Sequence, residues 1–216
     1  MYRYIFFDLD GTLTDSKEGV IKSARYAIEK MGWPQPSDDT MLKFVGPPLV
    51  DSFMEHCGAT RAQAEEAVEL YRERYTPIGL FENAAAEGAA ELLARLREKG
   101  YKTALASSKP EVMCVTVCDH FGFTPHLDVI SGSPLHGDYT KADVIRAAMA
   151  RLGLESAEGI LMVGDRKYDV LGAAECGIPC VGLTLFGYAE EGELEIAGAA
   201  DTVATLEELE TYILNH

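Results

Sequence analysis

Apolar residues in the first third of this chain change from a strand-like run to a helical spacing. The apolar run at residues 4–7 is followed by acidic residues and a Gly-Thr pair, which is typical of a buried parallel strand that ends in a turn. Apolar residues then recur at helical spacing over residues 16–31. Three more helices are predicted, at residues 38–44, 49–57 and 60–75. The last of them opens with a Thr-x-x-Gln capping box, and no strand is predicted in this block.

The rest of the chain alternates helices with short apolar strands. Strands are predicted at residues 101–106, 127–131, 159–163, 179–183 and 201–204. Helices are predicted at residues 87–99 and after residues 109, 140 and 205. This alternation indicates a doubly wound, Rossmann-like α/β fold with a parallel sheet and helices on both faces. The expected domains are an α/β core of residues 1–15 and 84–216 and an inserted all-helical cap of residues 16–83.

Composition narrows the class of protein. The chain has 216 residues and a net charge of −16, which disfavours non-specific binding to nucleic acids or anionic membranes. No stretch approaches the roughly 20 apolar residues of a membrane helix, and the first residues enter a core strand, so a cytoplasmic protein is expected. The five cysteines are expected to be reduced. Cys114 and Cys118 lie near His120, but no second Cys/His pair completes a metal site, so buried thiols are expected.

Asp8 and Asp10 are the first candidates for chemistry. They end the first predicted strand, and in open α/β sheets active sites form at the carboxyl ends of strands. Because side chains alternate along a strand and Gly11 turns the chain, the two carboxylates can enter one pocket in different roles. One can attack a substrate and the other can move protons. The alternative is that both are ordinary turn or cap residues.

The segment Asp8-Leu9-Asp10-Gly11-Thr12 resembles the first motif of the haloacid dehalogenase superfamily, Asp-x-Asp-Gly-Thr. Three further matches follow in the order of that superfamily. They are Ser107 after an apolar run, Lys141 at the start of a helix, and a Gly-Asp-x-x-x-Asp segment that contains Asp165 and Asp169. The resemblance implies a Mg²⁺-dependent phosphotransferase.

The resemblance also implies a role for each motif residue. Asp8 would be the nucleophile that forms an aspartyl-phosphate, and Asp10 would protonate the leaving oxygen and later activate water. Mg²⁺ prefers oxygen ligands, and its expected ligands are Asp8, the carbonyl of Asp10, and Asp165. Asp169 would orient ligands or waters around the metal. The phosphoryl oxygens would be contacted by Ser107 and Lys141, and by backbone N–H groups of Gly11 and Thr12.

One motif departs from the superfamily pattern. The commoner Lys-Pro-x-Pro is replaced by Thr140-Lys141-Ala142-Asp143, which keeps the lysine and loses the prolines. Ser108 and its neighbour Lys109 are further candidates for substrate contact, and either could equally cap the helix that follows Pro110.

In the predicted cap, Lys43 and Phe44 precede a Gly46-Pro47-Pro48 turn and are expected to contact the leaving group. The alternative is that this segment is only a rigid turn between helices. This segment is similar to a bacterial branch of the superfamily described as 5′-nucleotidases, and so are three others: Ser107-Ser108-Lys109-Pro110, Gly164-Asp165-Arg166-Lys167 and Phe186-Gly187-Tyr188.

The sequence therefore predicts a Mg²⁺-dependent phosphomonoesterase that acts on a small phosphorylated metabolite, with a nucleoside 5′-monophosphate as the first candidate. Phosphoglycolate or a sugar phosphate is the next candidate, and a phosphomutase remains open. Dehalogenation is disfavoured by Asp10, Asp165 and Asp169, which it does not need. The non-enzyme alternative is a sensor that binds a phosphometabolite without turnover. The sequence sets neither the substrate nor the oligomeric state.

Overall fold

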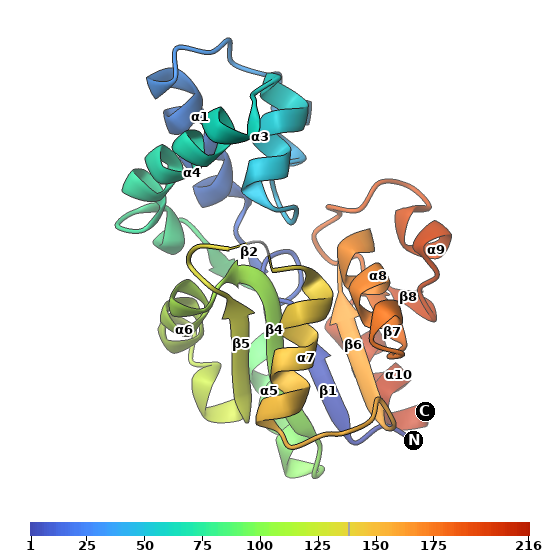
Figure 1. The fold of residues 1–216 in the computed structure, drawn as a ribbon. Coiled ribbons are helices and arrows are strands. Elements are labelled where there is room, and N and C mark those ends of the chain that lie inside the picture. The colour runs from blue at the N-terminus through green and yellow to red at the C-terminus, as the bar shows by residue number, and fades with distance from the viewer. Residues whose placement is uncertain (138) are drawn as a thin grey trace. The chain divides into compact units, whose positions relative to one another are not determined.

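The computed structural model describes residues 1–137 and 139–216. The chain divides into two compact units. The larger unit contains Met1–Thr14 and Ala85–His216, and the smaller unit contains Asp15–Ala84. Figure 1 shows the chain coloured from its first to its last residue.

The larger unit is built on a six-stranded sheet with the strand order β5-β4-β1-β6-β7-β8, in which every recorded strand pairing is parallel. The strands are β1 (Tyr4–Phe7), β4 (Lys102–Pro110), β5 (Val129–Ser133), β6 (Ile160–Gly164), β7 (Cys180–Leu183) and β8 (Asp201–Val203). β1 lies between β4 and β6 and pairs with both. The three central strands therefore end side by side at one edge of the sheet, which is where the sequence places its acidic residues.

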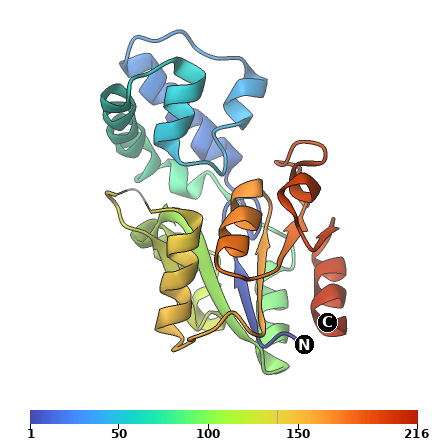
Figure 2. The ribbon, with the colours of Figure 1, turned by 45° about the vertical axis from the view of Figure 1, so that its right-hand side comes forward.

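Helices cover both faces of this sheet (Figures 1 and 2). One face carries α7 (Lys141–Arg151) and α8 (Lys167–Glu175), and the other carries α5 (Ala89–Glu98) and α10 (Leu206–Asn215). α6 (Glu111–His120) packs on β4 and β5, and α9 (Glu193–Ala197) packs on α8 and β8. Phe6, Ile145 and Met162 are each 0% exposed in the core beneath α7 and α8. The predicted doubly wound parallel sheet is confirmed.

The smaller unit is helical, apart from strand residues at its two ends. It contains α1 (Lys17–Lys30), α2 (Asp38–Leu42), α3 (Leu49–Cys57), α4 (Arg61–Tyr75) and the short 3₁₀ helix η1 (Gly79–Phe81). α4 packs against α1 and α3. Its predicted capping box is present, because the Thr60 side chain accepts from the Gln63 backbone N–H and the Gln63 side chain accepts from that of Thr60.

Several features differ from the sequence prediction. β4 continues to Pro110, four residues beyond the predicted end at residue 106, because Ser107 still pairs with Gly132 of β5. A small two-stranded sheet, β2 (Thr14–Asp15) and β3 (Ala84–Ala85), was not predicted because each strand has only two residues. A short 3₁₀ helix, η2 (Thr124–His126), also precedes β5.

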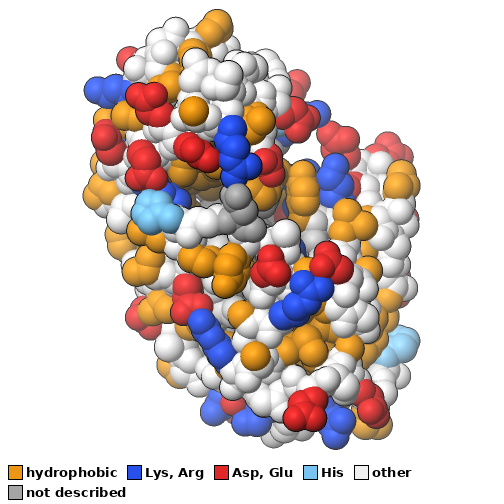
Figure 3. Space-filling view, viewed as in Figure 1, with side chains coloured by type: hydrophobic (Ala, Val, Ile, Leu, Met, Phe, Trp, Pro, Cys, Tyr) orange, Lys and Arg blue, Asp and Glu red, His pale blue; other side chains and the backbone are white. Residues whose placement is uncertain are grey.

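The surface is mixed in character. On the face shown in Figure 3, lysine and arginine side chains are scattered among acidic and apolar ones. A search of the described residues found no helix with the length and apolar character needed to cross a membrane.

Candidate active site

The proposed catalytic residues of the first, second and fourth motifs lie at the ends of neighbouring strands. Asp8 follows β1 directly, Ser107 lies in β4, and Asp165 follows β6 directly. Because β1 pairs with both neighbours, these three side chains come from adjacent positions along one edge of the sheet. All three are buried, with Asp8 7% exposed, Ser107 2% and Asp165 2%.

Asp8, Asp165 and Asp169 form a buried acidic cluster. Each offers one carboxylate oxygen, and these oxygens lie within 4.8 Å of one another. The Thr12 hydroxyl donates to Asp165 Oδ1 at 3.0 Å, whereas Asp165 Oδ2 is buried and has no hydrogen-bond partner among the described residues. Burial raises the pKa of the Asp165 carboxyl well above its ordinary value, and the carboxylates of Asp169 and Asp8 raise it further.

This arrangement fits a cation. Buried carboxylates so close together repel one another unless positive charge lies among them, and an unpartnered buried oxygen costs free energy that a metal ligand bond would recover. An all-oxygen donor set is the set that Mg²⁺ or Ca²⁺ prefers. The cluster is therefore suited to hold a hard divalent cation.

Lys141 supplies positive charge to this cluster. It is the first residue of α7, and its ammonium lies 2.7 Å from Asp8 Oδ1 and 2.7 Å from Asp169 Oδ1. Burial lowers the pKa of Lys141, but the carboxylates of Asp169 and Asp8 more than offset this, so the pKa is raised and the side chain stays charged. A capping box of Thr140 and Asp143 fixes the start of α7, in place of the prolines of the commoner motif.

Asp169 holds the turn that carries Asp165. Its Oδ2 accepts from the backbone N–H groups of Asp165 at 3.2 Å and Arg166 at 3.1 Å. With Oδ1 on Lys141, both oxygens of Asp169 have protein partners. Asp169 therefore holds the turn and also belongs to the acidic cluster. Its expected role in orienting groups around a metal stays a prediction.

Gly11 makes room for Asp165. It has a φ of +87°, and a Cβ built on it would lie 2.1 Å from Asp165 Oδ2. A side chain at this position would therefore collide with the acidic cluster and would also strain the backbone. The glycine of the first motif is required by the packing of the fourth.

Asp10 pairs with a residue to which the sequence assigned no such role. Lys109 Nζ lies 2.6 Å from Asp10 Oδ2, and the two side chains are 5% and 14% exposed. Asp10 Oδ1 is buried and has no hydrogen-bond partner among the described residues. Lys109 belongs to β4, which pairs with β1 in the sheet. Its position two residues after Ser107 was therefore the one signal in the sequence that it lies near Asp10.

The other predicted site residues are placed as follows. The Ser107 hydroxyl accepts from the Lys109 backbone N–H at 3.3 Å, while the Ser108 carbonyl accepts from the Ser133 hydroxyl at 2.8 Å. Pro110 precedes α6 with no side-chain cap, so the alternative that Ser108 or Lys109 caps this helix is wrong. Lys43 is exposed at the end of α2 in the smaller unit.

The expectation that Phe44 contacts a leaving group is wrong. Phe44 is 1% exposed, and its ring lies 5.2 Å from that of Phe53 and 5.5 Å from that of His56, measured between centroids. Its side chain thus belongs to the core of the smaller unit. The sequence alone does not separate an aromatic core residue from one that contacts a ligand.

Another buried ion pair lies beside the acidic cluster. Arg166 Nε is 2.8 Å from Glu193 Oε1, and the two side chains are 9% and 7% exposed. The same Glu193 oxygen accepts from the Lys167 backbone N–H at 2.9 Å. Glu193 was not predicted from the sequence, because it lies 28 positions after Asp165 in a stretch with several exposed acidic residues.

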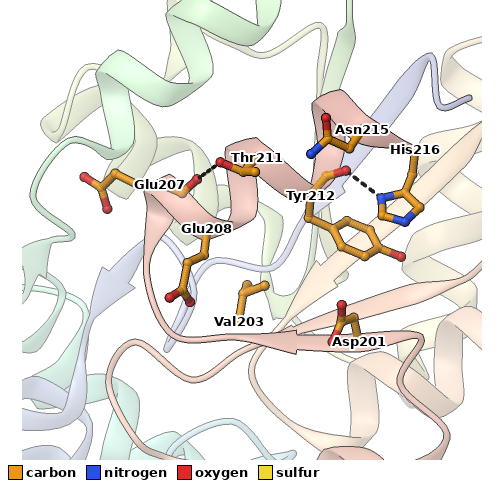
Figure 4. A pocket seen from close by; sticks show the side chains of 8 residues that line it. All are labelled: Asp201, Val203, Glu207, Glu208, Thr211, Tyr212, Asn215 and His216. Carbon is orange, nitrogen blue, oxygen red and sulfur yellow. Dashed lines mark hydrogen bonds between the residues drawn. The ribbon is translucent and has the colours of Figure 1, made fainter.

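A surface pocket of about 410 Å³ lies elsewhere in the larger unit, at β8 and α10 (Figure 4). Its lining includes Asp201, Glu207 and Glu208, and a hydrogen bond ties the His216 ring to the Tyr212 carbonyl at 2.9 Å. None of the motif residues lines it. The two thiols Cys114 and Cys118 are buried, as predicted: Cys114 Sγ donates to the Lys109 carbonyl at 3.4 Å, and burial raises the pKa of Cys118 to about 12.

Comparisons with known proteins identify the family. The model of the family described as haloacid dehalogenase-like hydrolase matches residues 5–183. A Pseudomonas aeruginosa protein named 5′-nucleotidase is 40% identical over 216 residues, which cover 100% of this chain and 97% of that protein. The chain therefore belongs to the haloacid dehalogenase-like hydrolases, as the sequence motifs predicted.

Two further proteins are similar to it. The crystal structure of a protein from Clostridium acetobutylicum, described as a predicted phosphatase, has a TM-score of 0.95 and 40% identity, and the match covers 100% of both chains. A protein of Mycobacterium tuberculosis named tyrosine-protein kinase PtkA is 40% identical over 178 residues, which are 82% of this chain and 60% of that protein.

Proposed function

We propose that this protein is a Mg²⁺-dependent phosphomonoesterase that hydrolyses a small phosphate ester through an aspartyl-phosphate on Asp8. The reaction class, a hydrolase acting on phosphate esters, is confirmed by the family and by the relatives named as phosphatase and nucleotidase. The residue roles, the metal and the substrate are proposals.

One observation carries the proposal. The buried cluster of Asp8, Asp165 and Asp169 keeps a carboxylate oxygen of Asp165 without a hydrogen-bond partner among the described residues. Such a cluster is costly unless it binds a cation. A Mg²⁺ ion held by Asp8, the Asp10 carbonyl and Asp165 would neutralise charge on the phosphoryl group that Asp8 attacks.

The protein residues account for both halves of the reaction. In the first, an Asp8 oxygen bonds to phosphorus, the bond to the leaving oxygen breaks, and that oxygen takes a proton from Asp10. In the second, Asp10 takes a proton from water, the water oxygen bonds to phosphorus, and the bond to Asp8 breaks to release phosphate. Asp10 Oδ1 is suited to carry the proton, because Oδ2 is held by Lys109.

Four more residues are proposed to hold the phosphoryl group. The Ser107 hydroxyl and the Lys141 ammonium would contact its oxygens, and the backbone N–H groups of Gly11 and Thr12 would line the turn beside it. Lys141 already lies 2.7 Å from Asp8, so it sits beside the atom to which phosphorus would be transferred. Its charge would be shared between Asp8, Asp169 and the incoming phosphate.

For the substrate, we propose a nucleoside 5′-monophosphate, which the name of the Pseudomonas relative supports. Phosphoglycolate and sugar phosphates remain the alternatives. Residues 16–83 as a cap domain, and Lys43 as a substrate contact in it, stay predictions. The kinase named among the relatives raises a second possibility, phosphoryl transfer to tyrosine, which would use the same groups around phosphorus but a different acceptor.

A substrate panel tests the proposal. Phosphate release is measured from AMP, 2-phosphoglycolate, glucose 6-phosphate and a small aryl phosphate, each with Mg²⁺ and with excess chelator. The expected result is Mg²⁺-dependent release, fastest from AMP, with Ca²⁺ failing to replace Mg²⁺ because its larger and looser coordination shell spoils the in-line geometry. Full activity in chelator, or no release from any ester, would contradict the proposal. A parallel incubation with ATP and a tyrosine peptide tests the kinase alternative.

A further inference from the structure

Glu193 is the most heavily hydrogen-bonded carboxylate beside the proposed metal site, and it takes no part in the proposed chemistry. Its Oε1 accepts from Arg166 Nε at 2.8 Å and from the Lys167 N–H at 2.9 Å. Its Oε2 accepts from Arg166 Nη2 at 3.3 Å and from the Glu190 N–H at 3.2 Å. A single side chain, 7% exposed, thus joins the loop before α9 to the turn after β6.

The turn that Glu193 holds is the one that carries Asp165. Arg166 and Lys167 follow Asp165 directly, and Asp169 holds the other side of the same turn through the N–H groups of Asp165 and Arg166. The turn is therefore fixed by two carboxylates. One belongs to the acidic cluster and the other, Glu193, does not.

A fixed turn matters because the three carboxylates of the cluster repel one another. Asp165 is 2% exposed, lies beside two other carboxylates, and has one buried oxygen without a partner among the described residues. Without a cation, repulsion and lost hydration favour movement of Asp165 away from Asp8 and Asp169. A turn that is free to move would relieve this repulsion, and cation binding would then have to reverse the movement.

We propose that Glu193 is a positioning residue that holds Asp165 in its metal-binding place before the cation arrives, by clamping Arg166 and Lys167. The inference rests on the proposed metal site. Groups that orient metal ligands from outside the coordination shell typically change metal affinity about 10- to 100-fold when they are altered. We call the contacts of Glu193 with Arg166 and Lys167 the clamp. Glu193 is expected to act in the same way through this clamp, although its own side chain touches no metal ligand.

The test is direct measurement of Mg²⁺ affinity by calorimetry on the full chain, without substrate. Glu193→Gln keeps the size of the side chain but removes the negative charge that pairs with Arg166. We expect the dissociation constant for Mg²⁺ to rise about tenfold or more. Arg166→Gln should have a similar effect. The double variant should be little worse than either single variant, because both changes break one clamp.

Two comparisons separate positioning from other effects. Glu191→Gln removes the same charge from an exposed position two residues before Glu193, and it should leave Mg²⁺ affinity within about twofold, since exposed charges are well screened. Thermal unfolding of each metal-free variant checks that the fold is intact. If Glu193→Gln unfolds at the preparation temperature, Arg166→Lys, which keeps the charge and loses the forked geometry, is measured instead and should weaken Mg²⁺ binding.

The outcomes distinguish this inference from the proposed function. If the wild type binds Mg²⁺, Asp165→Asn abolishes binding, and the folded clamp variants bind as the wild type does, the positioning role is overturned while the metal site stands. If the wild type binds no Mg²⁺, the metal site and the positioning role are both overturned. Weakened Mg²⁺ binding in the clamp variants, with unchanged binding in Glu191→Gln, supports the inference.

Discussion

Lys109 and Asp10 form a buried ion pair, with Nζ 2.6 Å from Oδ2, at the ends of neighbouring parallel strands. The pair leaves Asp10 Oδ1 as the oxygen that has no partner among the described residues. Asp10 is the proposed proton-transfer group, so in that proposal Lys109 leaves Oδ1 as the oxygen available to carry the proton.

The first prediction is that Lys109→Met lowers kcat by about tenfold or more, and by less than the 10²- to 10⁴-fold that loss of a general acid–base group costs. Without the ammonium, the Asp10 carboxyl is free to turn and its proton is misplaced. Steady-state kinetics on the best ester of the panel measures this, and Lys109→Arg should restore part of the rate.

Lys102→Met is the matched control. Lys102 begins the same strand, is 57% exposed and pairs with Asp128, so its loss should leave kcat unchanged. Equal kcat in Lys109→Met and wild type would show that the ion pair is purely structural. Unfolding midpoints are compared as well, because removal of one partner from a buried pair is destabilising.

The second prediction uses two glycines with nearly the same backbone angle. Gly11 (φ +87°) would place a Cβ 2.1 Å from Asp165 Oδ2, whereas a Cβ on Gly100 (φ +90°) would meet no described atom within 4 Å. Alanine at Gly100 should lower the free energy of unfolding by about 1–2 kcal/mol, the cost of the left-handed conformation. Alanine at Gly11 should lower it by more, because its Cβ also overlaps the Asp165 carboxylate. Only Gly11→Ala should also abolish Mg²⁺-dependent activity, because it displaces Asp165. An active Gly11→Ala variant would show that the contact between the two motifs is dispensable.

The third prediction compares the two capping boxes. Thr140→Ala and Thr60→Ala should each lower the free energy of unfolding by about 1 kcal/mol, because each removes a helix cap. Thr140→Ala should also lower kcat, because Lys141 is the next residue. If the whole loss of about 1 kcal/mol is added to the activation free energy, kcat falls by up to about fivefold. Chemical denaturation and kinetics measure both effects. A Thr140→Ala variant that loses stability and keeps full kcat would mean that Lys141 is held by its ion pairs alone.

The sequence predicted the sheet and the acidic cluster because both depend on local patterns. A buried parallel strand reads as an apolar run, and Asp8 and Asp165 each directly follow such a run. Once the strands are taken as parallel and adjacent, their carboxyl ends must meet, so the cluster follows from strand order and motif order together.

The partners of these residues were not predictable in the same way. Glu193 and Arg166 are 27 positions apart, and Asp10 and Lys109 come from separate strands, so nothing in the local pattern pairs them. The end of β4 was missed for a related reason. The apolar run stops at Ala106, but pairing with β5 continues because Gly132 leaves room there, with the Glu111 Cα only 2.5 Å from where a Cβ would lie.

The central claim is that Asp8 carries the phosphoryl group during turnover. The most direct test is to mix the enzyme with Mg²⁺ and its best ester, stop the reaction with acid within milliseconds, and analyse the peptides by mass spectrometry. We predict a phosphoryl group on Asp8 of the wild type, none in Asp8→Asn, and a loss of turnover in that variant by orders of magnitude with its thermal unfolding preserved. An unmodified Asp8 together with wild-type turnover by Asp8→Asn would contradict the account.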